Sequence, residues 1–170
     1  DCQTDVHDFW SAYFYLHFYT VNTAKLSENV WKEAEKMLEQ IQKYPQKEEY
    51  QKLVEADRIN LYEREAEKGD DRKFLEETDR VFKENLKGDP AWKLYERKLV
   101  YLESKQPDIS REFERFLKKY PKVMDAYVEY SIYLCRNNKM TQAQRVYREG
   151  RKQTGMTSKR AEELRRKLGL

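Results

Sequence analysis

The chain has 170 residues, of which 38% are charged and 14% aromatic, with only 5 Gly and 4 Pro. So few turn-forming residues exclude a turn-rich all-β protein, and large packing residues set among charges are typical of amphipathic helices. The 34 basic and 31 acidic residues leave a formal net charge of +3, so any nucleic-acid surface has to be local. The chain begins at Asp1 rather than Met, which suggests a piece of a longer protein.

Apolar residues recur at intervals of three and four along nearly the whole chain, and the breaks carry Pro, Gly, Asn or Ser. This periodicity predicts an all-α protein whose nine helices cover residues 5–22, 28–43, 46–68, 71–87, 90–105, 108–119, 122–137, 140–153 and 158–168. Connections this short favour antiparallel hairpins of consecutive helices. We therefore expect one domain, an α-α superhelix (solenoid) of about four hairpins, with repeats at 5–43, 46–87, 90–119 and 122–153 and a capping helix at 158–168.

A sequence motif recurs in the second helix of each hairpin. It reads "AEKMLEQIQ" from Ala34, "TDRVFKENL" from Thr78, "ISREFERFL" from Ile109 and "AQRVYREGR" from Ala143, with starts 44, 31 and 34 residues apart. Each first helix carries two large residues three apart: Trp10 and Tyr13, Ile59 and Tyr62, Trp92 and Tyr95, and Tyr127 and Tyr130. A period near 33 residues is typical of a helix-turn-helix solenoid.

Packing explains the motif. Its apolar positions lie on one stripe of the second helix, and large aromatic residues of the first helices fill the opposing grooves. A small residue, Gly150, lets two helix backbones approach closely. The residues predicted to pack between helices are Tyr62, Val81, Phe82, Trp92, Tyr95, Phe113, Tyr127, Tyr130, Ala143, Val146, Tyr147 and Gly150.

The repeats resemble a known family. "AWKLYERKLVYLES" with "ISREFERFL", and "AYVEYSIYL" with "AQRVYREGR", are similar to half-a-TPR, or HAT, repeats. The resemblance covers residues 5–153 and is strongest over 78–151. The sequence departs from the family pattern at Phe116, where a small residue is favoured, and at Glu112, where an aliphatic one is. Ordinary tetratricopeptide repeats fit less well, because their Gly and Ala positions are missing from the first helices.

The HAT resemblance implies a scaffold that binds other protein subunits of an RNA-processing ribonucleoprotein complex. Such complexes act in pre-mRNA splicing, 3′-end processing or pre-rRNA processing, and their HAT proteins are often homodimers. The expected location is the nucleus or nucleolus. Two alternatives stay open: a direct RNA-binding protein that uses a basic C-terminal surface, and a tetratricopeptide-type peptide-binding adaptor unrelated to RNA.

The first helix, "DFWSAYFYLHFYTVN", carries aromatic residues on nearly every side. A helix that is apolar all round has to be covered on more than one face. These residues therefore indicate either a partner or dimer interface, or a buried first helix. They are Phe9, Trp10, Tyr13, Phe14, Tyr15, Phe18 and Tyr19.

The C-terminal segment is strongly basic, with nine basic and three acidic residues in 141–170. Such an end can attract RNA phosphates or an acidic partner. The alternative is a solvated capping helix, since Leu164 and Leu168 lie on one side of "SKRAEELRRKLGL". The candidate contacts are Arg151, Lys152, Lys159, Arg160, Arg165, Arg166 and Lys167.

No catalytic, cofactor or metal site emerges from the sequence. His7 and His17 are ten residues apart with no further His or Cys at a metal-ligand spacing, and no Gly-rich phosphate loop occurs. We therefore expect no enzyme activity and no cofactor. Two cysteines at opposite ends of the sequence, Cys2 and Cys135, do not predict a disulfide framework, which fits a reducing compartment, and no apolar run is long enough to span a membrane.

Overall fold

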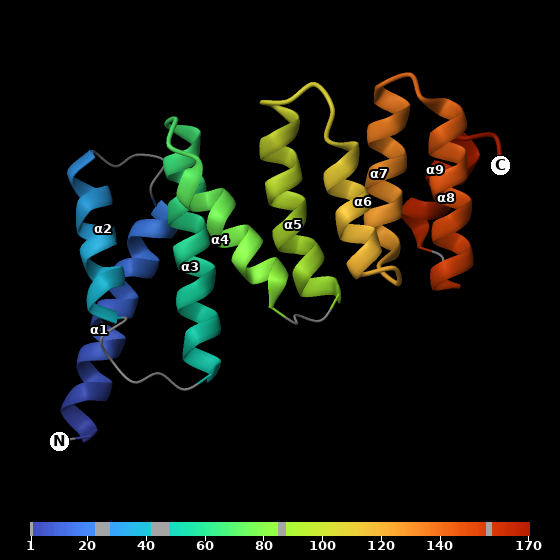
Figure 1. Ribbon diagram of the computed structural model, residues 1–170. Coiled ribbons are helices and arrows are strands. Elements are labelled where there is room, and N and C mark those ends of the chain that lie inside the picture. The colour runs from blue at the N-terminus through green and yellow to red at the C-terminus, as the bar shows by residue number, and fades with distance from the viewer. Residues whose placement is uncertain (1, 23–27, 42–47, 85–87, 156–157) are drawn as a thin grey trace. The chain divides into compact units, whose positions relative to one another are not determined.

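The computed structural model describes residues 2–22, 28–41, 48–84, 88–155 and 158–170 (Figure 1). Within these ranges the chain forms nine α-helices and no strand, so the predicted all-α class is confirmed. The helices are α1 (Cys2–Asn22), α2 (Glu28–Ile41), α3 (Glu48–Glu67), α4 (Arg72–Lys83), α5 (Gly88–Glu103), α6 (Ser110–Lys119), α7 (Met124–Arg136), α8 (Met140–Thr154) and α9 (Lys159–Lys167). The chain forms two compact units: unit 1 is Asp1–Glu77 and unit 2 is Thr78–Leu170.

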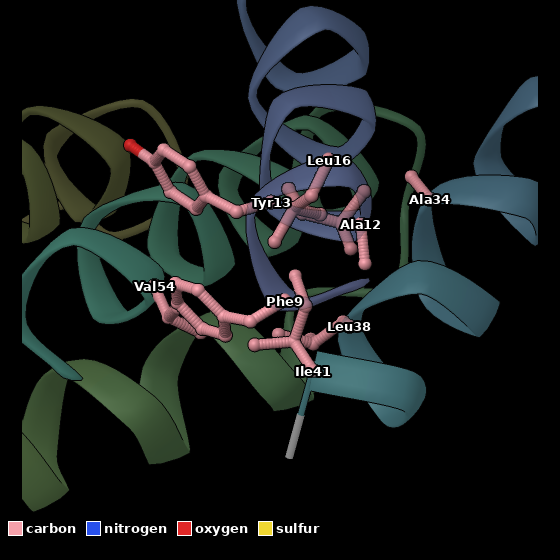
Figure 2. Close-up of a cluster of buried hydrophobic side chains, with 9 residues drawn as sticks. Phe9, Ala12, Tyr13, Leu16, Ala34, Leu38, Ile41 and Val54 are labelled. Atoms are coloured by element: carbon pink, nitrogen blue, oxygen red, sulfur yellow. The ribbon is translucent and has the colours of Figure 1, made fainter. Parts of the chain in front are cut away.

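The core of unit 1 lies between α1, α2 and α3 (Figure 2). Four residues of α1 point into it, Phe9, Ala12, Tyr13 and Leu16. The last three follow Phe9 by three, four and seven residues, a spacing that places all four on one face of the helix. The other helices contribute Ala34, Leu38, Ile41, Val54 and Leu61.

A buried carboxylate joins α1 to α3 beside this core. Asp57 is only 2% exposed, and His17 Nδ1 lies 3.1 Å from both of its carboxylate oxygens. Thr20 Oγ1 also donates a hydrogen bond of 2.9 Å to Asp57 Oδ1. Burial and the nearby Asp57 carboxylate raise the pKa of Tyr13. These partners replace the water that the carboxylate loses on folding.

Aromatic contacts between consecutive repeats of unit 2 use the same motif positions twice. Phe82, at the fifth motif position of α4, lies 4.7 Å from Tyr95 of α5, measured between ring centroids. Phe113, at the fifth motif position of α6, lies 4.8 Å from Tyr130 of α7. Tyr95 and Tyr130 are both the second large residue of their first helix. The helices α4 and α6 are thus joined to α5 and α7 by equivalent ring contacts.

Contacts within the hairpins of unit 2 also use equivalent positions. Trp92 of α5 lies 5.1 Å from Phe116, the eighth motif residue of α6. Tyr127 of α7 contacts Gly150, the eighth motif residue of α8. Phe116, the departure from the HAT pattern, is completely buried among aromatic rings. The large ring of Phe116 occupies the space between α5 and α6, whereas Gly150 leaves α7 and α8 free to approach. Accordingly, α7 packs on α8 far more extensively than α5 packs on α6.

Helix α9 covers the end of the last hairpin. Ala161, Leu164 and Leu168 are buried against α7 and α8. Tyr147, the fifth motif residue of α8, donates a 2.9 Å hydrogen bond to the Ala161 carbonyl instead of meeting another aromatic ring. Ser158 Oγ accepts from the Ala161 N–H at 3.1 Å and so caps the start of the helix.

The residues predicted to pack between helices lie mostly inside the protein. Tyr62 and Val146 are half-buried, whereas the remaining ten are buried: Val81, Phe82, Trp92, Tyr95, Phe113, Tyr127, Tyr130, Ala143, Tyr147 and Gly150.

The end of α4 differs most from its predicted position. The helix stops at Lys83 rather than at residue 87, and residues 85–87 lie outside the described ranges. At this end Lys119 Nζ donates to the carbonyls of Phe82, Lys83 and Glu84, the last two at 3.1 and 3.3 Å. A side chain from another helix thus satisfies the last carbonyls of α4, which the periodicity of α4 itself does not reveal.

Replacing Gly150 with Ala is expected to destabilise unit 2, because the new Cβ would lie 2.6 Å from both Cβ and Cγ of Tyr127. Overpacking of this kind costs about 1 to 3 kcal/mol in the free energy of unfolding. Urea denaturation followed by circular dichroism measures it. Arg148→Ala, at an exposed site two residues earlier on α8, is the control and should be near neutral. Equal stability of the two variants would contradict the close approach of α7 and α8.

Candidate functional site

The aromatic residues of α1 separate onto two faces. Phe9 and Tyr13 are buried in the core, and Trp10 is half-buried against it. Phe14, Tyr15 and Phe18 are 63%, 59% and 55% exposed. The side chain of Tyr19 lies outside the described part. We name Phe14, Tyr15 and Phe18 the exposed aromatic face; of the predicted interface residues whose side chains are described, these three are open to solvent.

The basic C-terminal residues also divide into two groups. Arg151 Nη1 and Arg165 Nε lie 2.6 and 2.8 Å from the Glu162 carboxylate, and Arg160 pairs with Glu129 of α7. The pairs of Arg151 and Arg160 hold α9 on the hairpin before it, whereas the pair of Arg165 lies within α9. The other four candidates, Lys152, Lys159, Arg166 and Lys167, are exposed, and no ion pair engages them within the described part of the chain.

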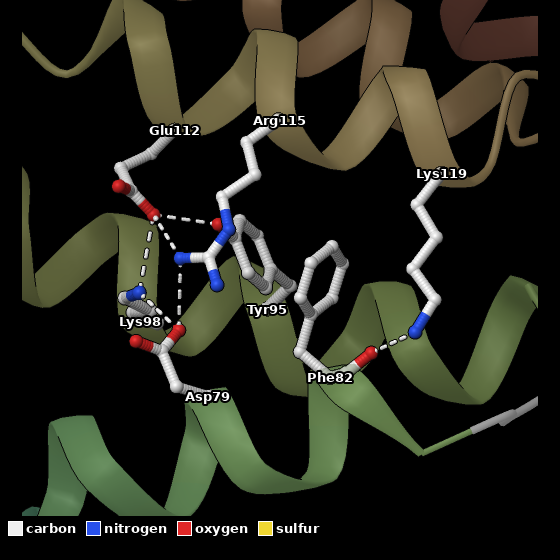
Figure 3. A network of polar contacts seen from close by, with 7 residues as sticks. All are labelled: Asp79, Phe82, Tyr95, Lys98, Glu112, Arg115 and Lys119. Atoms are coloured by element: carbon white, nitrogen blue, oxygen red, sulfur yellow. Dashed lines mark hydrogen bonds and ion pairs between the residues drawn. The ribbon is translucent and has the colours of Figure 1, made fainter.

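A polar network missed by the sequence analysis joins α4, α5 and α6 (Figure 3). Lys98, only 4% exposed, lies 2.8 Å from Asp79 Oδ1 and 3.1 Å from Glu112 Oε2. Arg115 Nη1 approaches the same two oxygens at 3.1 and 3.6 Å, and Tyr95 donates its hydroxyl to Glu112 Oε2 at 2.6 Å. Two cations therefore face two carboxylates across three helices. The signal in the sequence was Glu112, a charge where the repeat favours an aliphatic residue.

The electrostatics of this network favour a fixed arrangement of charges. Burial acts to raise the pKa of Glu112, but hydrogen bonds from Tyr95 and Lys98 and the charges of Lys98 and Arg115 outweigh it, so the pKa is lowered. Burial, together with the Glu112 carboxylate, raises the pKa of Tyr95. The phenol therefore stays protonated and the carboxylate stays ionised near neutral pH. Such a network holds helices in register and offers no nucleophile or poised base.

A groove lies on the surface of unit 2 between α6 and α8. Its volume is about 750 Å³, and Tyr127, Tyr130 and Leu134 of α7 line it between the two helices. This volume falls within the range of about 300 to 1,000 Å³ that is usual for ligand pockets. Helix periodicity does not reveal this groove, because its lining residues come from three helices.

Among the residues that the structure describes, no cluster of three or more His, Cys, Asp or Glu side chains is placed to hold a metal ion. None of the helices in the described ranges is both long and apolar enough to cross a membrane.

Comparison with known proteins found no match: no family model, no curated protein and no solved structure is detectably similar to this chain.

Replacing Lys98 with Met should destabilise the protein, because Asp79 and Glu112 would lose their buried cation while the side chain keeps its length. Breaking a buried ion pair from one side costs about 3 to 5 kcal/mol, and the lower end is expected here because both carboxylates are partly exposed. Urea denaturation is the measurement. Lys93→Met, at an exposed site of the same helix, is the control. A near-neutral Lys98→Met variant would contradict the network.

Replacing Glu112 with Gln should change how stability depends on pH. The pKa of Glu112 is lowered below its ordinary 4.5, so ionised Glu112 stabilises the folded state above that value. This contribution is lost as pH falls from 4.5 through the pKa of the folded state. Wild-type stability should therefore exceed that of the variant at about pH 7, and the difference should shrink at about pH 3.

Urea denaturation at both pH values measures the effect of Glu112→Gln. Glu163→Gln serves as the control, because Glu163 is exposed and forms no ion pair in the described part of the chain. A difference between wild type and Glu112→Gln that stays constant with pH would show that the Glu112 charge contributes nothing.

Proposed function

We propose that this chain is a HAT-type scaffold that binds other protein subunits of an RNA-processing ribonucleoprotein complex in the nucleus. Its helix hairpins would stack as an α-α superhelix of about four repeats closed by α9. The observation that carries the proposal is the repeated ring contact, Phe82 with Tyr95 at 4.7 Å and Phe113 with Tyr130 at 4.8 Å. Equivalent motif positions that make equivalent contacts are what stacked repeats require.

The surfaces left by this packing favour binding over catalysis. The exposed aromatic face, Phe14, Tyr15 and Phe18, offers large rings of the kind that anchor protein interfaces. It is the predicted site for a partner subunit or for a second copy of the chain. The polar network in unit 2 is enclosed by its own partners, which suits a rigid support better than a reacting site.

The RNA-processing context of the proposal rests on the resemblance of residues 78–151 to HAT repeats. A specific observation also supports direct RNA binding as a second candidate. Lys152, Lys159, Arg166 and Lys167 are exposed, and none is ion-paired within the described ranges, so they are available to phosphates. Three of the other basic residues are already engaged with Glu162 or Glu129, which leaves a smaller basic surface than the sequence predicted.

Affinity capture from nuclear extract tests the proposal, with this chain as bait, with and without nuclease, and mass spectrometry as the readout. Proteins of one RNA-processing particle should remain bound after nuclease treatment. Replacing both Phe14 and Phe18 with Ser should lower their recovery, because both rings are exposed. Val100→Ser, which alters an exposed apolar residue of α5, is the matched control and should leave the recovery of these proteins unchanged.

Two outcomes would contradict the scaffold. If recovery is lost on nuclease treatment, RNA is the bridge, and the four exposed basic residues become the site to replace. If the nuclease-resistant partners have no connection with RNA, the adaptor alternative replaces the RNA-processing one.

A further inference from the structure

The groove of unit 2 has a polar pattern that specifies its occupant. Its two walls are α6 and α8, which begin at the same end of the unit (Figure 1). At that end Asp108, two residues before α6, pairs with Lys139, one residue before α8, at 3.0 Å. This ion pair closes one end of the groove.

Beyond the closing ion pair, the two walls carry opposite charges at two equivalent positions, counted in residues along each helix. Six residues beyond the closing ion pair lie Glu114 on α6 and Arg145 on α8. Ten residues beyond it lie Lys118 on α6 and Glu149 on α8. Although all four line the groove, none forms an ion pair across it in the described structure; Glu114 accepts a 3.2 Å hydrogen bond from the Tyr130 hydroxyl, and Glu149 accepts one from Gln153. The charges of one wall are thus not paired with those of the other, and both carboxylates keep lone pairs that can accept further hydrogen bonds.

The charge balance of the groove disfavours a polyanion or a strongly charged peptide. Three acidic residues, Asp108, Glu114 and Glu149, balance the three basic ones, so the groove has no net charge. A phosphate chain that approached Arg145 would also approach Glu114. A helical ligand is disfavoured as well, because a helix already satisfies its own backbone groups.

An extended main chain matches the pattern on both walls. Each wall carries one carboxylate and one cation, and each edge of an extended chain presents both N–H donors and C=O acceptors. The two positions are four helix residues apart, a rise of about 6 Å. Two residues of an extended chain rise about 6.6 Å, so backbone groups that face one wall recur at nearly the same interval. The apolar floor of Tyr127 and Leu134 can accept side chains that point into the groove.

We propose that the groove between α6 and α8 binds an extended, uncharged segment of a partner protein. Carboxylates of Glu114 and Glu149 accept hydrogen bonds from its backbone N–H groups, and Arg145 and Lys118 donate to its carbonyls. This inference rests on the proposed protein-binding function and names the chemistry of one partner segment. Main-chain hydrogen bonds provide the affinity, and the floor selects side chains.

The test uses a phage-displayed library of random linear decapeptides, selected on the whole chain. Recovered sequences are synthesised with a fluorophore, and their dissociation constants are measured by fluorescence anisotropy. The expected peptides carry little net charge. Arg145→Glu should weaken their binding about tenfold or more, because it puts a like charge opposite Glu114 and removes a donor. Arg148→Glu, on the exposed side of the same helix, should leave it unchanged.

A second probe asks whether the main chain is recognised. The best peptide is resynthesised with alternate residues N-methylated, which removes N–H donors and keeps every side chain. Binding should again fall about tenfold or more. Unchanged affinity of the methylated peptide, recovery of strongly acidic peptides, or recovery of none that is sensitive to Arg145→Glu would each overturn the proposal.

Failure of this inference is distinguishable from failure of the scaffold. If nuclease-resistant capture persists while no peptide responds to Arg145→Glu, the scaffold stands and the groove is not its binding site. If peptides bind as expected while capture is lost on nuclease treatment, the groove stands and the RNA-processing scaffold does not.

Discussion

Burial of aromatic rings between successive helices is the constraint on which unit 2 depends. A hairpin of two short amphipathic helices leaves one apolar face uncovered, and it becomes stable only when the next hairpin covers that face. Phe82 and Phe113 make the same ring contact with the first helix of the next hairpin, and the Tyr147 hydroxyl donates a hydrogen bond to α9 instead. Because the large rings are committed to these contacts, the faces left to solvent are charged. Binding surfaces of unit 2 therefore have to be built from charge patterns over small apolar floors.

The polar network of Lys98, Asp79, Glu112 and Arg115 lies beside this aromatic packing and restricts it further. Ring contacts tolerate sliding of one helix along another, whereas two cations opposite two carboxylates do not. A buried ion pair need not add much net stability, because desolvation offsets its Coulomb energy. Its contribution here is to select one register for α4, α5 and α6. A fixed register would matter for the proposed scaffold, since a binding surface spread over several helices exists only while those helices keep their alignment.

The sequence predicted the helices well and their polar contacts poorly, for a physical reason. Helix periodicity is local, so every helix of the described chain appeared near its predicted place, and the spacing of Trp92 with Tyr95 and of Tyr127 with Tyr130 indicated which residues would be packed. Pairs such as Arg160 with Glu129 depend on the angle and height at which helices meet, which periodicity does not encode. For the same reason the sequence alone could not show which of the seven aromatic residues of α1 are buried and which are exposed. The opposed charges of the groove were present in the sequence as pairs 31 residues apart, but the pattern has meaning only once α6 and α8 are known to be its walls.

The contact of Lys119 with the last carbonyls of α4 has a consequence for how the protein fluctuates. Helix ends normally fray independently, each at little cost in free energy. Here the final residue of α6 holds the final turn of α4, and its positive charge lies at the negative ends of both helix dipoles. Fraying at the end of α6 withdraws the Lys119 side chain and breaks these hydrogen bonds. The C-terminal ends of α4 and α6, about 36 residues apart in the chain, are therefore expected to be coupled, so that backbone amides at the end of α4 lose protection against hydrogen exchange when α6 frays.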